Sequence, residues 1–159
     1  MSHFTLDQVM QLAVGHHQAG RLPIAEQLYR QILIEVPTHV PALHNLALIL
    51  HQAGGRDEAV DLLHLAVALK PNFPEAQVNL GNVLKETGKL DHAIAAYLRA
   101  IALNHEMSVA HCNLGVALRE KGQLEEAIAA FRRAIALKPD YADAHGNLGV
   151  ALKDGGRLA

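Results

Sequence analysis

Four asparagines, each 34 residues from the next, are the residues whose type and spacing most suggest a chemical role. They are Asn45, Asn79, Asn113 and Asn147, in the segments HNLALIL, VNLGNVL, CNLGVAL and GNLGVAL. Asparagine is a mediocre helix former, because its amide competes for backbone hydrogen bonds. A carboxamide can donate to one carbonyl and accept from one N–H, so a row of them could hold an extended peptide of any sequence. The alternative is that these amides cap or bridge neighbouring helices.

The same spacing organises nearly the whole chain. Aligning the asparagines gives gapless blocks at 6–39, 40–73, 74–107 and 108–141, with a partial fifth block at 142–159. Numbered from one within a block, position 7 is always Leu, position 8 is Ala or Gly, and position 15 is always Gly. A period of this length is typical of stacked helix pairs. The sequence therefore predicts one all-α domain, residues 1–159, in which each helix pair buries its apolar face against the next.

Signals for helix ends recur at fixed positions of the block. Positions 4, 7, 8 and 11 form one apolar stripe on a helix. The glycine at position 15 is expected to stop that helix in a left-handed conformation. Asp57, Asp91 and Glu125 then stand where a second helix begins and where a carboxylate suits the helix dipole. Proline at position 32 ends the second helix, and small residues at positions 8 and 20 let the two helices approach closely.

By its period and its pattern of small, Gly, Ala, aromatic and Pro positions, the sequence resembles the tetratricopeptide repeat over residues 6–159. The resemblance implies a solenoid of antiparallel helix pairs that forms a right-handed superhelix, with the first helices lining a concave groove. It implies a protein–protein interaction module without chemistry of its own. It also implies that position 6 faces the groove, so that the four asparagines form a column there, with Gln11 as the amide of the first block. This arrangement is similar to the asparagine ladder in the repeats of O-linked N-acetylglucosamine transferases.

Other polar residues fall on the stripe that the resemblance assigns to the groove. Asn82 is at position 9, and Lys85 and Arg119 are at position 12. A basic column would favour acidic peptides or a carboxylate terminus. Position 13 carries Glu86 and Glu120, and this acidic column could neutralise the basic one. We include Asn82, Lys85 and Arg119 with the four asparagines as candidate peptide-binding residues.

The histidines and the single cysteine do not form a pattern that catalysis or metal binding requires. No pair among the eleven histidines has the i, i+4 spacing with a partner carboxylate that a helical zinc site uses. His111 is adjacent to Cys112 but points about 100° away on a helix, so it is poorly placed as a base. Neither a glycine-rich phosphate loop nor a Ser–His–Asp arrangement is present. We expect no enzymatic activity, no cofactor and no metal site.

Composition favours a soluble cytoplasmic protein. The net charge is −2, which does not favour nucleic-acid binding. No apolar run of about 18 residues could form a transmembrane segment. The N-terminus lacks the basic and apolar regions of a secretory signal, and one cysteine fits a reducing compartment.

The end of the sequence leaves several functions open. A helix over about 142–154 would leave Leu148, Ala151 and Leu152 uncovered. Either a longer protein continues there, or this edge mediates self-association. The first functional hypothesis is a non-catalytic scaffold or adaptor that binds an extended peptide segment of a partner. One alternative is the substrate-selecting N-terminal region of a bacterial O-linked N-acetylglucosamine transferase-like enzyme. Another is a small adaptor of a bacterial filament or membrane, similar to kinesin light chains.

Overall fold

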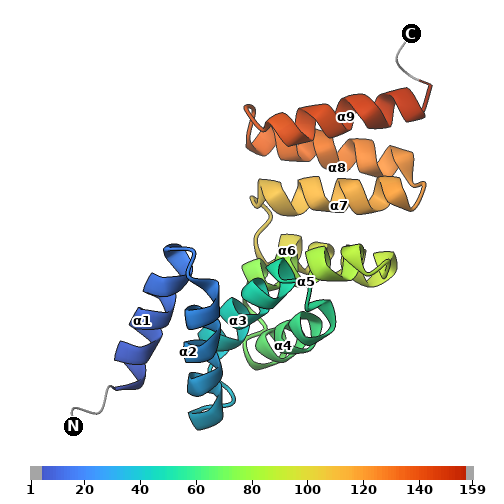
Figure 1. Cartoon of the computed structure of the whole chain (residues 1–159). Coiled ribbons are helices and arrows are strands. Elements are labelled where there is room, and N and C mark those ends of the chain that lie inside the picture. The colour runs from blue at the N-terminus through green and yellow to red at the C-terminus, as the bar shows by residue number, and fades with distance from the viewer. Residues whose placement is uncertain (1–4, 157–159) are drawn as a thin grey trace. The chain divides into compact units, whose positions relative to one another are not determined.

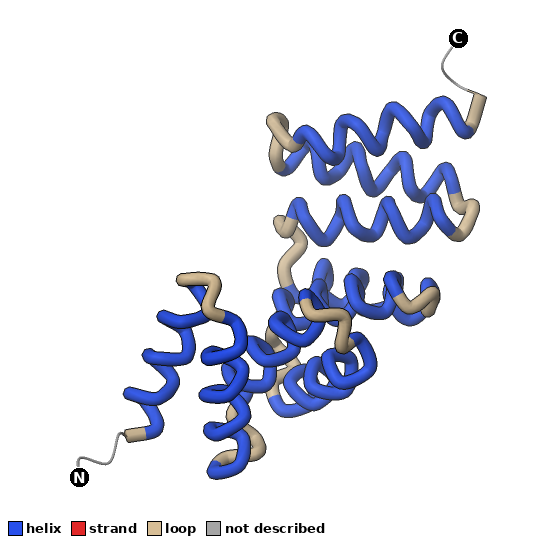
Figure 2. Tube along the Cα trace, viewed as in Figure 1, coloured by secondary structure: helices blue, strands red, loops and turns tan. Residues whose placement is uncertain are grey.

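The computed structural model describes residues 5–156, which form α-helices joined by short loops and include no strand (Figure 2). The helices are α1 (Leu6–Gln18), α2 (Leu22–Glu35), α3 (Val40–Gln52), α4 (Arg56–Leu69), α5 (Pro74–Glu86), α6 (Leu90–Leu103), α7 (Ser108–Glu120), α8 (Leu124–Leu137) and α9 (Ala142–Asp154). Each begins and ends at the same positions of the 34-residue block as its counterparts. None of these described helices is long and apolar enough to cross a membrane.

The chain divides into two compact units, Met1–Pro71 with α1 to α4 and Asn72–Ala159 with α5 to α9. Within the first unit, consecutive helices pack against each other. Within the second unit they do so too, and α7, α8 and α9 are seen as stacked layers in Figure 1. In addition, α5 contacts α7, and α7 contacts α9. The all-α prediction is confirmed, and the first helices of successive repeats lie side by side in the second unit.

The glycine at position 15 ends each first helix as predicted. Its φ is positive in all five blocks, for Gly20, Gly54, Gly88, Gly122 and Gly156. At Gly122, with φ 83°, the glycine N–H donates to the carbonyl of Arg119 over 2.9 Å, and the N–H of Gln123 donates to that of Leu118 over 2.9 Å. These two bonds satisfy carbonyls that the helix end would otherwise leave unpaired. The second helices end before position 32, and α6 ends there even though His105 replaces the proline.

The small residue at position 8 makes room for the aromatic ring at position 24. Tyr97 and Phe131 are fully buried in α6 and α8. A Cβ atom added to Gly81 would lie 2.5 Å from the ring of Tyr97, and one added to Gly115 would lie 2.6 Å from the ring of Phe131. Real Cβ atoms do not approach so closely, so a larger residue at either place would force the ring or the backbone to shift. This confirms the predicted close approach within each of these two helix pairs.

Two histidines at position 4, in α7 and α9, each form a hydrogen bond with the loop that precedes their helix. The side chain of His111 donates from Nε2 to the carbonyl of His105 over 3.1 Å. The side chain of His145 donates in the same way to the carbonyl of Pro139 over 2.8 Å. A carbonyl can only accept, which fixes the proton on Nε2 in both rings. Burial lowers the pKa of His111, which keeps the ring neutral near pH 7.

The last helix is covered more fully than the sequence suggests. Ala151 is completely buried, so the prediction that it would be left uncovered is wrong. Val83 and Ala117, at the same position 10 of the two blocks before it, are also completely buried. Leu148 and Leu152 are partly exposed, and Val150 is 46% exposed.

Candidate functional site

All of the candidate binding residues lie on first helices of the repeats. Asn45 is in α3 of the first unit, while the others belong to the second unit. Asn79, Asn82 and Lys85 are in α5, Asn113 and Arg119 are in α7, and Asn147 is in α9. Each of these seven side chains is partly exposed. Lys85 and Arg119 lie in the last turns of their helices, where a cation also complements the helix dipole.

The structure brings Asn82 and Asn113 together. The side-chain N–H of Asn113 donates to Oδ1 of Asn82 over 2.9 Å. The hydroxyl of Tyr97 donates to the same oxygen over 2.8 Å. One amide oxygen of α5 therefore receives bonds from α6 and α7. This arrangement matches the bridging alternative for Asn113, and it leaves the second amide proton and the carbonyl oxygen of Asn113 for another partner.

A related contact occurs in the first unit around Tyr29. Its hydroxyl lies 3.5 Å from Nδ1 of His17, and the two rings are arranged edge to face. Burial raises the pKa of Tyr29, and a hydrogen bond with Asn45 opposes that rise. In both units the tyrosine at position 24 thus lies near the asparagine at position 6 of the following repeat. Tyr29 is influenced by Asn45, and Tyr97 is linked to Asn113 by the hydrogen bonds that both donate to Asn82.

Asn147 has a different environment, because position 24 before it is Phe131, which has no hydroxyl. Its amide instead lies near the thiol of Cys112 and acts to lower the pKa of that thiol. Cys112 is buried, which raises its thiol pKa, while hydrogen bonds from Tyr141 and Asn147 oppose the rise. Burial and the neighbouring Cys112 raise the pKa of Tyr141 to about 12. Both groups are therefore protonated at neutral pH, and the thiol is a poor nucleophile.

A pocket of about 420 Å³ opens between α7 and α9. Its walls are formed by Cys112, Asn113, Val116, Tyr141, Ala142, Asp143, Gly146 and Asn147. On α7 these are positions 5, 6 and 9, and on α9 they include positions 2, 5 and 6, which is the stripe that the repeat resemblance assigns to the groove. The pocket thus brings together Asn113 and Asn147, two of the predicted residues. The sequence reasoning did not select Tyr141 or Asp143, although Asp143 belongs to that stripe by its position.

Carboxylates influence the polar groups of this surface. Burial is the main cause of the raised pKa of Tyr97, and the negative charges of Glu120 and Glu86 add to it. The charge of Asp143 likewise contributes to the raised pKa of Cys112 and of Tyr141. Acidic side chains of the second unit therefore lie close enough to act on these three groups.

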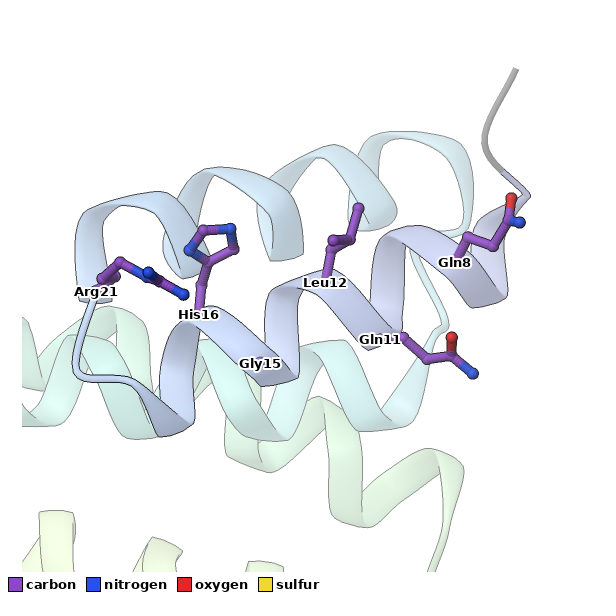
Figure 3. Close-up of a pocket in the computed structure, with 6 residues that line it drawn as sticks. All are labelled: Gln8, Gln11, Leu12, Gly15, His16 and Arg21. Carbon is purple, nitrogen blue, oxygen red and sulfur yellow. The ribbon is translucent and has the colours of Figure 1, made fainter. Parts of the chain in front are cut away.

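The first unit has a separate pocket of about 400 Å³ on α1 (Figure 3). Gln8, Gln11, Leu12, Gly15, His16 and Arg21 line it. Figure 3 shows Leu12 and His16 pointing to the same side of the helix, while Gln11 points away from them. Leu12 is 43% exposed. Across residues 5–156, no group of three or more His, Cys, Asp or Glu side chains could hold a metal ion.

Comparison with solved structures shows the same fold in several proteins. The crystal structure of MamA protein is 27% identical, with a TM-score of 0.88, and the match covers 96% of this chain and 83% of that one. MamA from Desulfovibrio magneticus RS-1, in a form that starts at residue 41, is 20% identical with a TM-score of 0.88, over 96% and 86% of the two chains. YrrB, described as a TPR protein with an unusual peptide-binding site, is 22% identical with a TM-score of 0.83, over 97% and 79%. At the identities of the last two, the likeness concerns the fold alone.

Models of known protein families match most of the sequence. No curated protein matches the chain. A model described as tetratricopeptide repeat matches residues 42–77, and a model described as TPR repeat matches residues 81–119 and 117–156. Together these segments cover more than half of the chain, and they extend from α3 to the loop after α9. The chain therefore belongs to the tetratricopeptide repeat family.

Proposed function

We propose that this protein is a non-catalytic interaction module that holds an extended segment of a partner protein along the first helices of its second unit. The observation that carries the proposal is the pocket between α7 and α9, which contains Asn113 and Asn147 on its walls. Both amides can bond to a peptide backbone, which is the same in every sequence. Asn79, Asn82, Lys85 and Arg119 would extend this surface along α5 and α7, and Asn45 would act in the first unit.

The proposal is supported by family membership and by the character of the pocket. YrrB, which shares the fold, is described as having a peptide-binding site. The pocket walls combine amides with Val116 and with the tyrosine ring of Tyr141, which is the mixture found in sites that fix a peptide by a few polar bonds between apolar contacts. The buried, protonated thiol of Cys112 fits a surface that binds and does not react. We place this activity in the cytoplasm, where a single cysteine stays reduced.

A displayed peptide library tests the proposal. Random linear peptides of about eight residues, extending over roughly 27 Å, would be selected on the immobilised chain. Enriched peptides would then be measured by fluorescence anisotropy against the wild type, Asn113→Ala and Asn147→Ala. Each variant is expected to bind about fivefold more weakly, the scale of one hydrogen bond.

Asn104→Ala is the matched control, because Asn104 follows α6 away from the pocket and its side chain accepts a hydrogen bond from the backbone N–H of Glu106. It should bind like the wild type. Circular dichroism of every variant would confirm that the helices are retained. Equal binding by the wild type and both pocket variants would overturn the proposal, as would a library from which no peptide is enriched.

A further inference from the structure

The pocket between α7 and α9 has one ionised group among the side chains that line it, and that group is a carboxylate. Asp143 lies in the first turn of α9 and is exposed. The other polar walls are neutral, since Asn113 and Asn147 are amides, and Cys112 and Tyr141 keep their protons at neutral pH. The pocket therefore carries a net negative charge.

Of the described residues, no lysine or arginine lines the pocket to neutralise the charge of Asp143. In the described part of the second unit, Asp91 is paired with Lys121, and no such pair includes Asp143. Lys138 lies over the ring of Tyr141, with Nζ 5.3 Å from the ring centroid, but it does not line the pocket. The negative charge of Asp143 still acts on the hydroxyl of Tyr141 and on the thiol of Cys112.

The shape of the pocket allows a long side chain to enter. Gly146 stands on the wall next to Asn147, and a Cβ atom added there would meet no atom within 4 Å. Val116 and the ring of Tyr141 offer apolar surface on the α7 and α9 sides. Lysine and arginine bury their aliphatic stems against such surface while their charged ends stay near water. The amide oxygens and the Asp143 carboxylate are acceptors, and these two side chains carry only donors.

We propose that this pocket selects a lysine or arginine side chain of the bound peptide, with the charged end at Asp143 and the peptide backbone at Asn113 and Asn147. The inference rests on the proposed function and deepens it by naming the class of partner. It differs from what Lys85 and Arg119 would favour, because those cations lie in the last turns of α5 and α7 and not among the pocket walls.

Peptide pools with one fixed central residue test this selection. Five pools of about eight residues would carry Lys, Arg, Gln, Leu or Glu at the centre and mixed residues elsewhere. Their binding to the wild type would be measured by fluorescence anisotropy. Because Asp143 is exposed, the Lys and Arg pools are expected to bind about threefold more tightly than the Gln pool, and the Glu pool more weakly than all others. The preference should shrink at high salt.

Variants of the pocket residues test whether the preference for Lys and Arg depends on Asp143. Asp143→Asn should remove the advantage of Lys and Arg while the Gln pool binds as before. Asp140→Asn is the matched control, since Asp140 is exposed in the loop before α9 and does not line the pocket, and it should keep the preference. Gly146→Leu should fill the pocket and weaken all five pools.

The possible failures are distinguishable. Binding of the pools without a preference for Lys or Arg would overturn this inference and leave the proposed function standing. A preference that survives in Asp143→Asn would also overturn it. Absence of binding by every pool would overturn the proposed function and this inference together.

Discussion

Tyr97 and Asn113, which lie on different helices, donate hydrogen bonds to the same atom, Oδ1 of Asn82, over 2.8 and 2.9 Å. The tyrosine ring is buried against Gly81 of α5, so the hydroxyl emerges at the side of the helix pair where Asn82 stands. The two bonds use both lone pairs of that oxygen. They connect α5, α6 and α7 through one side chain.

Tyr97→Phe should lower the free energy of unfolding by about 1 kcal/mol, because one hydrogen bond is lost while the ring and its packing remain. Asn82→Ala should cost more, because it leaves the hydroxyl of Tyr97 without its acceptor. Urea unfolding followed by circular dichroism measures both. The double variant should lose less free energy of unfolding than the sum of the losses in the two single variants. Additive losses would show that the two side chains are not energetically coupled.

Gly115→Ala should destabilise the protein by about 1–3 kcal/mol, because the new methyl group would overlap the buried ring of Phe131. Gly149→Ala is the matched control at the same position of the next repeat. A Cβ atom at Gly149 meets nothing within 4 Å, so the substitution should stabilise α9 by about 0.5–1 kcal/mol through helix propensity. Thermal unfolding compares the two. Similar shifts in both variants would contradict the packing described for position 8.

Cys112 should react slowly with iodoacetamide at about pH 7, because burial raises its pKa and keeps the thiol protonated. Reaction should accelerate only at a higher pH than for an unperturbed cysteine. The same chain unfolded in urea is the control and should react at the ordinary rate. A folded protein that reacts as fast as the unfolded chain would show that the thiol is accessible and ionises normally.

The same shift links stability to pH. A thiol whose pKa is higher in the folded state than in the unfolded state favours folding while it is protonated. Stability should therefore fall as the pH rises through the ordinary thiol range, near 8.5, since the unfolded chain ionises first. Cys112→Ser, followed by urea unfolding across that range, should lose this slope. If the stability of Cys112→Ser depended on pH as that of the wild type does, the pH dependence would come from other groups.

The features that the sequence predicted correctly are those that depend on local geometry and repeat in every block. A glycine in the left-handed conformation, such as Gly122, ends its helix through local geometry alone. The small residue at position 8 recurs every 34 residues, so the close approach of the two helices could be predicted from the spacing. The bounds of α9 followed from the same register. The period therefore contains enough information to define the helices and their pairing.

Contacts between side chains of different helices were harder to predict. Asn113 could point toward a bound peptide or toward Asn82, and only the placement of α5 beside α7 shows the second contact. Asp143 was overlooked as a pocket residue because its position also suits a helix start, where an acidic side chain needs no further explanation. Ala151 was assigned to the uncovered face because positions 7 and 11 around it are apolar, although position 10 is completely buried in this block and in the two before it.

The constant helix bounds have a consequence for chains of other lengths. Removing residues 108–141 would join α6 to α9 through a loop at the same block positions, so that the helix ends and their glycine caps would be unchanged. Asn147 would then replace Asn113 beside Asn82 and Tyr97, and a tyrosine hydroxyl would again be connected to the asparagine of the next repeat. A gene that loses or duplicates one such block would produce a protein whose local structure is already correct, and natural selection could alter the length of the binding surface in steps of one repeat.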